Sequence, residues 1–262
     1  MDGRHVSVRV VQPLAGPLDP HSALTTVIES IAAASGTTDL LVLPELATTR
    51  YDIRRHIGEV APLVDSGAFD QVRAQVSEAS LVAVIGMVEV NGEELFNSAV
   101  VIDADGSIAG IVRKSHLFAG ERKVFAAGAT IEPIRTSLGA LGVAICYDIE
   151  FPEVARSLAL TGADMLVVLS ANMHPYTDYH VTYAKARAME NQLPLALSNW
   201  VGQGPRFDFL GRSCIVSAQG QILADAGDRP GHADATLCLG PSPDMDADLD
   251  YLGQRRPELY RQ

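Results

Sequence analysis

Short apolar runs alternate with helix-like segments along almost the whole chain, and this alternation narrows the folds that the chain can adopt. Leu40–Leu43 has the length and composition of a buried strand, whereas apolar side chains recur at helical spacing along Pro20–Ala34. Alternating strands and helices are typical of layered α/β folds. At 262 residues, the chain has the length of one large domain of this kind.

Turn-forming dipeptides add antiparallel hairpins to this pattern. Asn91-Gly92 separates the strand-like runs Leu81–Val90 and Leu95–Ile102, which is a strong signal of a hairpin. Asp105-Gly106 and Gln219-Gly220 mark two more turns. Further strands are predicted at His5–Val11, Ile108–Val112, Met165–Leu169 and Leu195–Ser198, and further helices at Phe69–Ala79, Pro152–Thr161 and Tyr179–Gln192.

Two pairs of segments give the chain a faint internal repeat. Ala99–Ile108 resembles Ser213–Ile222, and Asp39–Val42 resembles Asp164–Val167. Two similar halves would produce two sheets packed face to face, with helices on both outer faces. Chance similarity between hydrophobic strands is the alternative. No linker rich in proline and glycine divides the chain, so residues 1–262 are expected to form a single domain.

The composition excludes several classes of partner. The formal net charge of −12 argues against nucleic acids and anionic membranes, whose binding needs clustered lysine and arginine. Apolar stretches such as Leu81–Val88 fall well short of the ~18 residues that span a bilayer. The N-terminus leads into a short apolar alternation rather than the core of a signal peptide, so the protein is expected to be soluble and cytoplasmic.

Cysteine and histidine spacing argues against disulfides and metals. The three cysteines, Cys146, Cys214 and Cys238, are odd in number and far apart, which does not fit a disulfide framework. No CxxC or HExxH pattern occurs, so no protein-bound metal is expected. Cys214 and Cys238 lie in predicted strands, where a small side chain usually contributes packing.

Cys146 lies where a buried strand is expected to turn toward a helix. It follows the apolar run Leu141–Ile145, and Pro152 marks the start of the next helix. A thiol in this position is expected to be rigidly held, partly exposed and close to backbone N–H groups that favour negative charge. These conditions suit a nucleophile, although a lone buried cysteine is more often a packing residue.

Two charged residues follow strand-like runs in the same manner. Pro44 interrupts the run Leu40–Leu43 just before Glu45, and Lys114 comes at the end of another such run. The carboxyl ends of strands in open α/β folds gather ligands, so we expect Glu45, Lys114 and Cys146 to share a pocket. A glutamate can accept the thiol proton, and a lysine can stabilise the resulting anion.

Three segments together resemble the motifs of a known enzyme family. Leu43–Glu45, Arg113–Phe118 and Cys146–Glu153 resemble, in order and separation, the three motifs of the nitrilase superfamily, the carbon–nitrogen hydrolases. This resemblance covers essentially the whole chain and implies an α/β fold, a four-layer αββα sandwich in which two packed mixed sheets carry helices on both outer faces. It also implies a homodimer or higher homo-oligomer, with the C-terminal tail 241–262 packed on a neighbour.

The resemblance implies a role for each matching residue. Glu45 would act as general base, Lys114 as electrostatic stabiliser and Cys146 as nucleophile. Glu121, in the segment Phe118–Phe125, matches the family's second active-site glutamate and would hold Lys114 or the substrate nitrogen in place. No cofactor is needed for this chemistry, so none is expected.

The residues after the cysteine bear on the substrate. Cys146-Tyr147-Asp148 resembles amidase branches of the superfamily, which predicts hydrolysis of small aliphatic or amino-acid-derived amides through a cysteine thioester. A nitrilase, an N-carbamoyl hydrolase and a non-catalytic binding scaffold are the alternatives. Tyr147, Tyr51, Asn172 and Met173 are expected to line the substrate pocket, although the segment around Asn172 also suits an ordinary turn.

Overall fold

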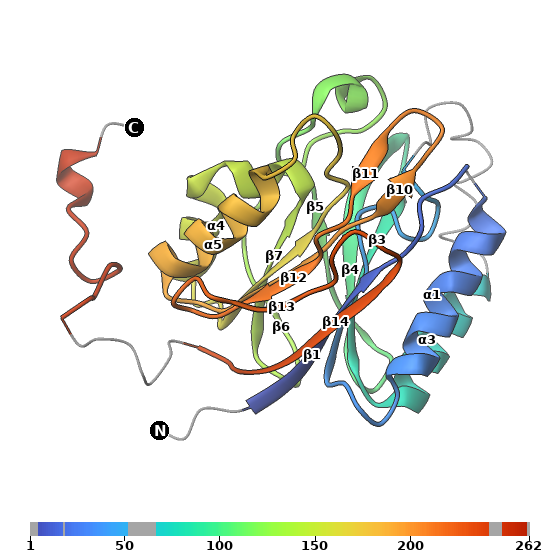
Figure 1. Cartoon of the computed structure of the whole chain (residues 1–262), viewed down its shortest axis with the longest axis horizontal. Coiled ribbons are helices and arrows are strands. Elements are labelled where there is room, and N and C mark those ends of the chain that lie inside the picture. Colours follow the sequence, from blue (N-terminus) through green and yellow to red (C-terminus); the bar gives the residue numbers. More distant parts are fainter. Residues whose placement is uncertain (1–4, 18, 52–66, 241–247, 261–262) are drawn as a thin grey trace.

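The computed structural model describes residues 5–17, 19–51, 67–240 and 248–260, which contain two six-stranded mixed sheets (Figure 1). The first sheet has the order β14-β1-β2-β3-β4-β5, with β1 at His5–Gln12, β2 at Leu40–Val42, β3 at Val82–Asn91, β4 at Glu94–Ile102, β5 at Ile108–Arg113 and β14 at Gly231–Cys238. The second has the order β13-β12-β9-β8-β7-β6, with β6 at Ile134–Arg135, β7 at Ala140–Ile145, β8 at Met165–Leu169, β9 at Leu195–Ser198, β12 at Cys214–Val216 and β13 at Ile222–Asp225.

Helices cover the outer face of each sheet, namely α1 (Pro20–Ala34) and α3 (Gly67–Ala79) on the first and α4 (Pro152–Leu160) and α5 (Tyr179–Asn191) on the second (Figure 1). The first pair of helices buries side chains of the first sheet such as Leu41 and Ile85. The second pair buries Leu166 and Val168 of β8. The resulting order of layers is the αββα sandwich that the sequence predicted.

Local sequence explains where two of these helices begin. The Asp19 side chain accepts a hydrogen bond from the Ser22 N–H at 3.0 Å, which satisfies one of the free donors at the start of α1. Pro20 and Pro152 each occupy a first helical turn, where a missing N–H costs nothing and a fixed φ is already helical.

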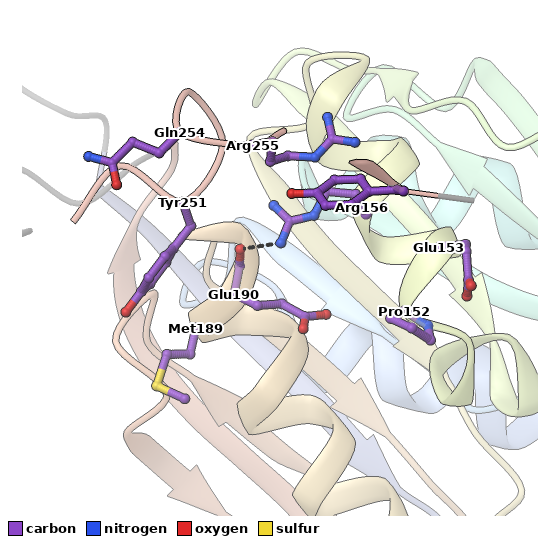
Figure 2. A pocket seen from close by; sticks show the side chains of 9 residues that line it. Pro152, Glu153, Arg156, Met189, Glu190, Tyr251, Gln254 and Arg255 are labelled. Atoms are coloured by element: carbon purple, nitrogen blue, oxygen red, sulfur yellow. Dashed lines mark hydrogen bonds between the residues drawn. The ribbon is translucent and has the colours of Figure 1, made fainter. Parts of the chain in front are cut away.

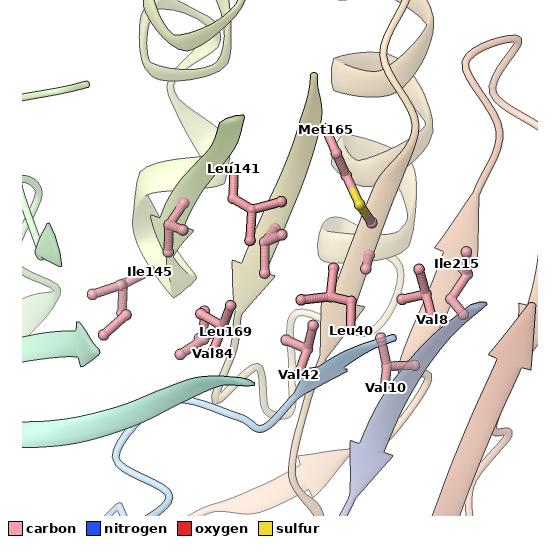
Figure 3. Close-up of a cluster of buried hydrophobic side chains, with 14 of the residues drawn as sticks. Val8, Val10, Leu40, Val42, Val84, Leu141, Ile145, Met165, Leu169 and Ile215 are labelled. Atoms are coloured by element: carbon pink, nitrogen blue, oxygen red, sulfur yellow. The ribbon is translucent and has the colours of Figure 1, made fainter. Parts of the chain in front are cut away.

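The main core lies between the two sheets. Leu40 and Val42 of β2 share this space with Leu141 and Ile145 of β7 and with Leu169 of β8, and all five are fully buried (Figure 3). Full burial of each such side chain contributes about 1.5–3 kcal/mol. Because the central strands are covered on both faces, they form continuous apolar runs instead of alternating ones.

The two sheets share one topology, which confirms the internal repeat. In each sheet three neighbouring strands run parallel, β1-β2-β3 in the first and β7-β8-β9 in the second. Beyond the parallel strands, an antiparallel hairpin lies at one edge of each sheet, β4-β5 in the first and β12-β13 in the second. A single antiparallel strand forms the other edge, β14 in the first sheet and β6 in the second. The similar segments Ala99–Ile108 and Ser213–Ile222 form the matching turns of these hairpins.

Some local features differ from the sequence prediction. The helix expected soon after Cys146 is preceded by a 3-10 helix, η4 (Cys146–Glu150), before α4 begins. A two-stranded sheet of β10 (Val201–Gln203) and β11 (Asp208–Leu210) was not predicted, because three residues give too little alternation to detect. Residues 1–4, which precede the predicted strand His5–Val11, and residues 241–247 and 261–262 of the expected tail lie outside the described residues.

Within the described part of the chain, no helix is long and apolar enough to cross a membrane. In the same residues, no group of three or more His, Cys, Asp and Glu side chains is placed to hold a metal ion.

Gly86 of β3 allows the chain that carries Glu45 to pass directly over the first sheet. A β-carbon at this position would lie 2.3 Å from the Pro44 carbonyl oxygen and 2.5 Å from the Leu46 nitrogen. Both atoms belong to the backbone and cannot rotate away. Any side chain at Gly86 would therefore displace the segment on either side of Glu45.

We expect Gly86→Ala to lower both stability and activity, because overpacking of this kind costs about 1–3 kcal/mol and moves Glu45. Gly67→Ala is the matched control, since nothing lies within 4 Å of its β-carbon position. Thermal unfolding measures the first effect, and the rate of the amide hydrolysis that the sequence predicts measures the second. Equal unfolding temperatures and equal turnover for the two variants would contradict the close approach.

Candidate active site

A buried ion pair joins the ends of two strands of the first sheet. Lys114 follows β5 directly, and its Nζ lies 2.6 Å from Glu45 Oε1, three residues after β2. Both side chains are 0% exposed. Two charges leave water at the cost of several kcal/mol each, so such a pair persists only with close geometry and further hydrogen bonds.

Glu121 supplies a second carboxylate to the same ammonium group. It lies in the 3-10 helix η3 (Ala119–Lys123), and its Oε1 and Oε2 are 3.0 and 2.9 Å from Lys114 Nζ. The Phe118 N–H donates to Oε2 at 2.7 Å, and the Tyr51 hydroxyl donates to Oε1 at 2.8 Å. Lys114 is therefore held between two oriented carboxylates.

Asn97 and Trp200 complete the support of Glu45, and neither was predicted from the sequence. The Asn97 amide of β4 donates to Glu45 Oε1 at 2.6 Å and to Glu121 Oε1 at 3.4 Å. Trp200 Nε1 donates to the Glu45 carbonyl at 2.8 Å. Asparagine is depleted in strands, and its position inside β4 is the signal that could have revealed Asn97.

Cys146 is more buried than the sequence suggested. It was expected to be partly exposed, yet it is 7% exposed and belongs to the core cluster between the sheets, because β7 buries every residue that leads to it. Its φ of 49° is left-handed, which costs a non-glycine residue about 1–3 kcal/mol. This conformation turns the chain abruptly from β7 into η4.

One carboxylate ties the loop of Lys114 to the loop of Cys146. Asp148 Oδ1 accepts hydrogen bonds from the His116 N–H at 2.8 Å and contacts His116 Nδ1 at 2.9 Å. Its Oδ2 accepts from the Ile145 N–H at 3.1 Å and from the Ser115 N–H at 3.4 Å. Asp148 is nearly fully buried, so these contacts fix the relative position of the two loops.

Burial and mutual charge interactions set the protonation of the cluster. Burial raises the pKa of Glu45 to about 7, with Lys114 lowering it in part and Glu121 raising it further. Burial also raises the pKa of Cys146, as does Glu45, while Lys114 and the Ala171 N–H lower it. Burial alone would lower the pKa of Lys114, but Glu45, Cys146 and Glu121 raise it above its ordinary value. The cluster therefore combines a thiol, an ammonium and a carboxyl group that titrates near neutral pH.

Tyr51 and Tyr147 both belong to aromatic groups beside this cluster. Tyr51 donates to Glu121 and packs edge-on against Phe207 and Phe209, with ring centroids 5.9 and 6.0 Å away. Tyr147, the residue after Cys146, packs edge-on against Phe118 at 5.4 Å. Both tyrosines therefore supply apolar surface close to the cluster.

Asn172 and Met173 lie in the segment that follows β8. Met173 forms an isolated antiparallel bridge with Phe209 and belongs to the same core cluster as Cys146. The Asn172 amide donates to the Tyr176 carbonyl at 3.1 Å. The amide of Asn172 is thus already engaged in holding its own loop, as the turn interpretation of this segment expected.

A separate cavity of about 700 Å³ lies away from this cluster, between α4, α5 and the C-terminal segment 248–260 (Figure 2). Arg156 and Met189 of the helices and Tyr251 of the C-terminal segment are among its lining residues. Leu252 packs against the core between α4, α5 and the second sheet. The described part of the tail thus contacts its own chain, and the homodimer stays a prediction.

The chain belongs to the carbon–nitrogen hydrolase family, whose model matches residues 7–239. An (R)-stereoselective amidase from Pseudomonas sp is 34% identical over 253 residues, which are 96% of this chain and 92% of that one. A nitrilase from Pyrococcus abyssi is 32% identical, covering 97% of this chain and 99% of its own.

A solved structure extends this likeness to three dimensions. An amidase from Nesterenkonia sp. AN1 aligns with a TM-score of 0.87 at 30% identity, covering 99% of this chain and 97% of that one. That structure, of a glutamate-to-glutamine mutant, shows covalent addition of the acetamide moiety of fluoroacetamide at the active site cysteine. The present chain is accordingly a carbon–nitrogen hydrolase with the nitrilase-superfamily fold, as its sequence motifs predicted.

Asp148→Asn should lower turnover about 10- to 100-fold, because a displacement of catalytic groups by an ångström can cost about that much. Asp103→Asn is a matched control. Asp103 accepts hydrogen bonds from the backbone N–H groups of Ala104 and Ser137, each at 2.8 Å. It lies in the turn between β4 and β5, at the opposite end of these strands from Lys114. Measuring turnover well below the unfolding temperatures of both variants separates misalignment of the two loops from loss of stability. Equal turnover in the two variants would contradict the role of Asp148.

Proposed function

We propose that this protein is an amidase that hydrolyses small aliphatic or amino-acid-derived amides to the acid and ammonia. The observation that carries the proposal is the state of Glu45. One of its oxygens binds Lys114, while the other, Oε2, is buried and has no hydrogen-bond partner among the described residues. A buried carboxylate oxygen without a partner is costly, and it suits a group that must receive a proton during the reaction.

In the first half of the reaction, Glu45 accepts the thiol proton as the Cys146 sulfur attacks the amide carbonyl. Negative charge develops on the substrate oxygen, and Lys114 together with the Tyr147 N–H stabilises it. Glu45 then donates its proton to the amide nitrogen. The C–N bond breaks, ammonia leaves, and the acyl group remains on Cys146 as a thioester.

In the second half, Glu45 acts again as general base. It removes a proton from water as the water oxygen attacks the thioester carbonyl. The C–S bond breaks, the proton returns to the sulfur of Cys146, and the carboxylic acid leaves. Each step uses only proton transfer and a nucleophilic attack, so the residues of the cluster suffice.

Glu121 has a supporting role in this scheme. It balances the charge of Lys114 and is itself fixed by the Tyr51 hydroxyl and the Phe118 N–H. This arrangement keeps Lys114 charged and aimed at the position where the oxyanion forms. The likeness to amidases from Pseudomonas and Nesterenkonia supports an amide substrate, and the likeness to a nitrilase keeps nitriles as the second candidate.

Purified enzyme should release ammonia from amides such as propionamide and acrylamide faster than from the corresponding nitriles. Cys146→Ala should abolish the release, while Cys214→Ala should retain it, because Cys214 is a fully buried strand residue outside the cluster. Faster turnover of nitriles, or ammonia only from N-carbamoyl compounds, would overturn the amidase assignment. Turnover of none of these substrates would favour the binding scaffold.

The kcat/KM for an amide should rise as the pH rises through about 7, because the pKa of Glu45 is raised to about 7 and only its deprotonated form is a base. Glu89→Gln is a control, since Arg113 and Ser98 hold the pKa of Glu89 below its ordinary value despite burial. That variant should keep the wild-type midpoint. A kcat/KM that stays constant between about pH 5 and pH 9 would contradict the role of Glu45.

A further inference from the structure

A buried histidine outside the catalytic cluster connects the two loops behind Cys146. His180 of α5 is 3% exposed. Its Nδ1 lies 2.8 Å from the Ser170 hydroxyl, directly after β8, and its Nε2 lies 3.5 Å from Glu150 Oε1, at the end of η4. The proposed reaction gives none of these three side chains a chemical step, yet a buried histidine with two polar partners needs a reason.

Asn172, Ser170, His180 and Glu150 form a hydrogen-bonded series, and the groups at its two ends fix the direction of each bond. The Asn172 N–H donates to the Ser170 hydroxyl oxygen at 3.1 Å. At the other end, the Glu150 carboxylate can only accept a hydrogen bond, so the neutral ring carries its proton on Nε2 toward Glu150, and Nδ1 accepts the Ser170 proton. Burial lowers the pKa of His180, as does Lys114, while Glu150 raises it only in part, so the ring is neutral as this assignment requires.

Ser170 links this hydrogen-bonded series to the catalytic residues. Its carbonyl accepts the Glu45 N–H at 3.4 Å. The next residue, Ala171, belongs to the same core cluster as Cys146, because Ile145 and Leu169 are paired in register at the ends of β7 and β8. The Ala171 backbone lowers the pKa of the Cys146 thiol. At the other end of the hydrogen-bonded series, Glu150 belongs to the same 3-10 helix as Cys146. His180 therefore contacts both the 3-10 helix that carries the sulfur and the segment that follows β8.

We propose that His180 is a positioning residue that, by anchoring Ser170, holds the backbone of Ala171 beside the Cys146 sulfur. The proposal rests on Cys146 being the nucleophile. The decisive contact is the one at Nδ1, because it fixes the Ser170–Asn172 segment, whereas the longer contact at Nε2 fixes the ring.

Two substitutions separate these contacts. In His180→Asn the side-chain oxygen falls near the position of Nδ1 and can still accept the Ser170 proton. In His180→Gln the amide reaches instead toward the position of Nε2 and Glu150. The readout is the rate at which iodoacetamide alkylates Cys146, followed by mass spectrometry as a function of pH. Alkylation reports the thiolate directly and needs no amide turnover, so it also distinguishes failure of this proposal from failure of the amidase assignment.

We expect His180→Asn to keep the wild-type pH midpoint of alkylation. His180→Gln and His180→Ala should raise that midpoint by about one pH unit and lower kcat about tenfold, with little change in KM, because the thiolate loses a backbone donor. Ser170→Ala should raise the midpoint by a similar amount. His232→Asn is a control histidine substitution in β14, on a half-exposed side chain remote from the cluster, and it should leave the midpoint unchanged.

The variants also distinguish loss of the His180–Ser170 contact from a general loss of folding. If His180→Ala does not fold, Ser170→Ala still tests the proposal, and combining Ser170→Ala with His180→Gln should add no further shift, because both act on one contact. A folded His180→Gln or Ser170→Ala protein with the wild-type midpoint would overturn the proposal. So would an equal shift in His180→Asn and His180→Gln.

Discussion

The buried ammonium of Lys114 is the constraint on which the rest of the site depends. With neither its own side chain nor that of Glu45 exposed, the charge persists only because Glu45 and Glu121 both contact it. Breaking such a pair by removing one partner typically costs about 3–5 kcal/mol. The loops that carry the two glutamates must therefore close on Lys114 for the fold to be stable, so folding and assembly of the site are one process.

The site lies at the seam between the two sheets. Glu45 and Lys114 follow strands of the first sheet, whereas Cys146 follows β7 of the second. The apolar layer between the sheets thus sets the distance between the two charged side chains and the sulfur. Gly86 and Asp148 make this arrangement possible, the first by admitting the backbone of Glu45 and the second by joining the two loops. A rigid core supports the precise placement that catalysis requires.

The sequence predicts the strand ends well, because these depend on local patterns, whereas the layers were predicted from the internal repeat and from the family resemblance. Continuous apolar runs identified the buried strands, and the residue that follows each run identified Glu45, Lys114 and Cys146. Asn97, Asp148 and His180 escaped prediction as supporting groups because their partners lie far away in the chain, as with Asn97 and Glu45, 52 positions apart. The burial of Cys146 also depends on packing between the sheets, which no local pattern encodes.

The proposed mechanism requires Cys146 to carry the acyl group during turnover. The most direct test is to quench the enzyme with acid while it hydrolyses an amide, digest it, and measure the peptide masses by mass spectrometry. The peptide with Cys146 should gain the mass of the acyl group and lose it when the thioester is treated with hydroxylamine. An acyl group found on a different residue, or sustained turnover by enzyme whose Cys146 has already been alkylated, would contradict it.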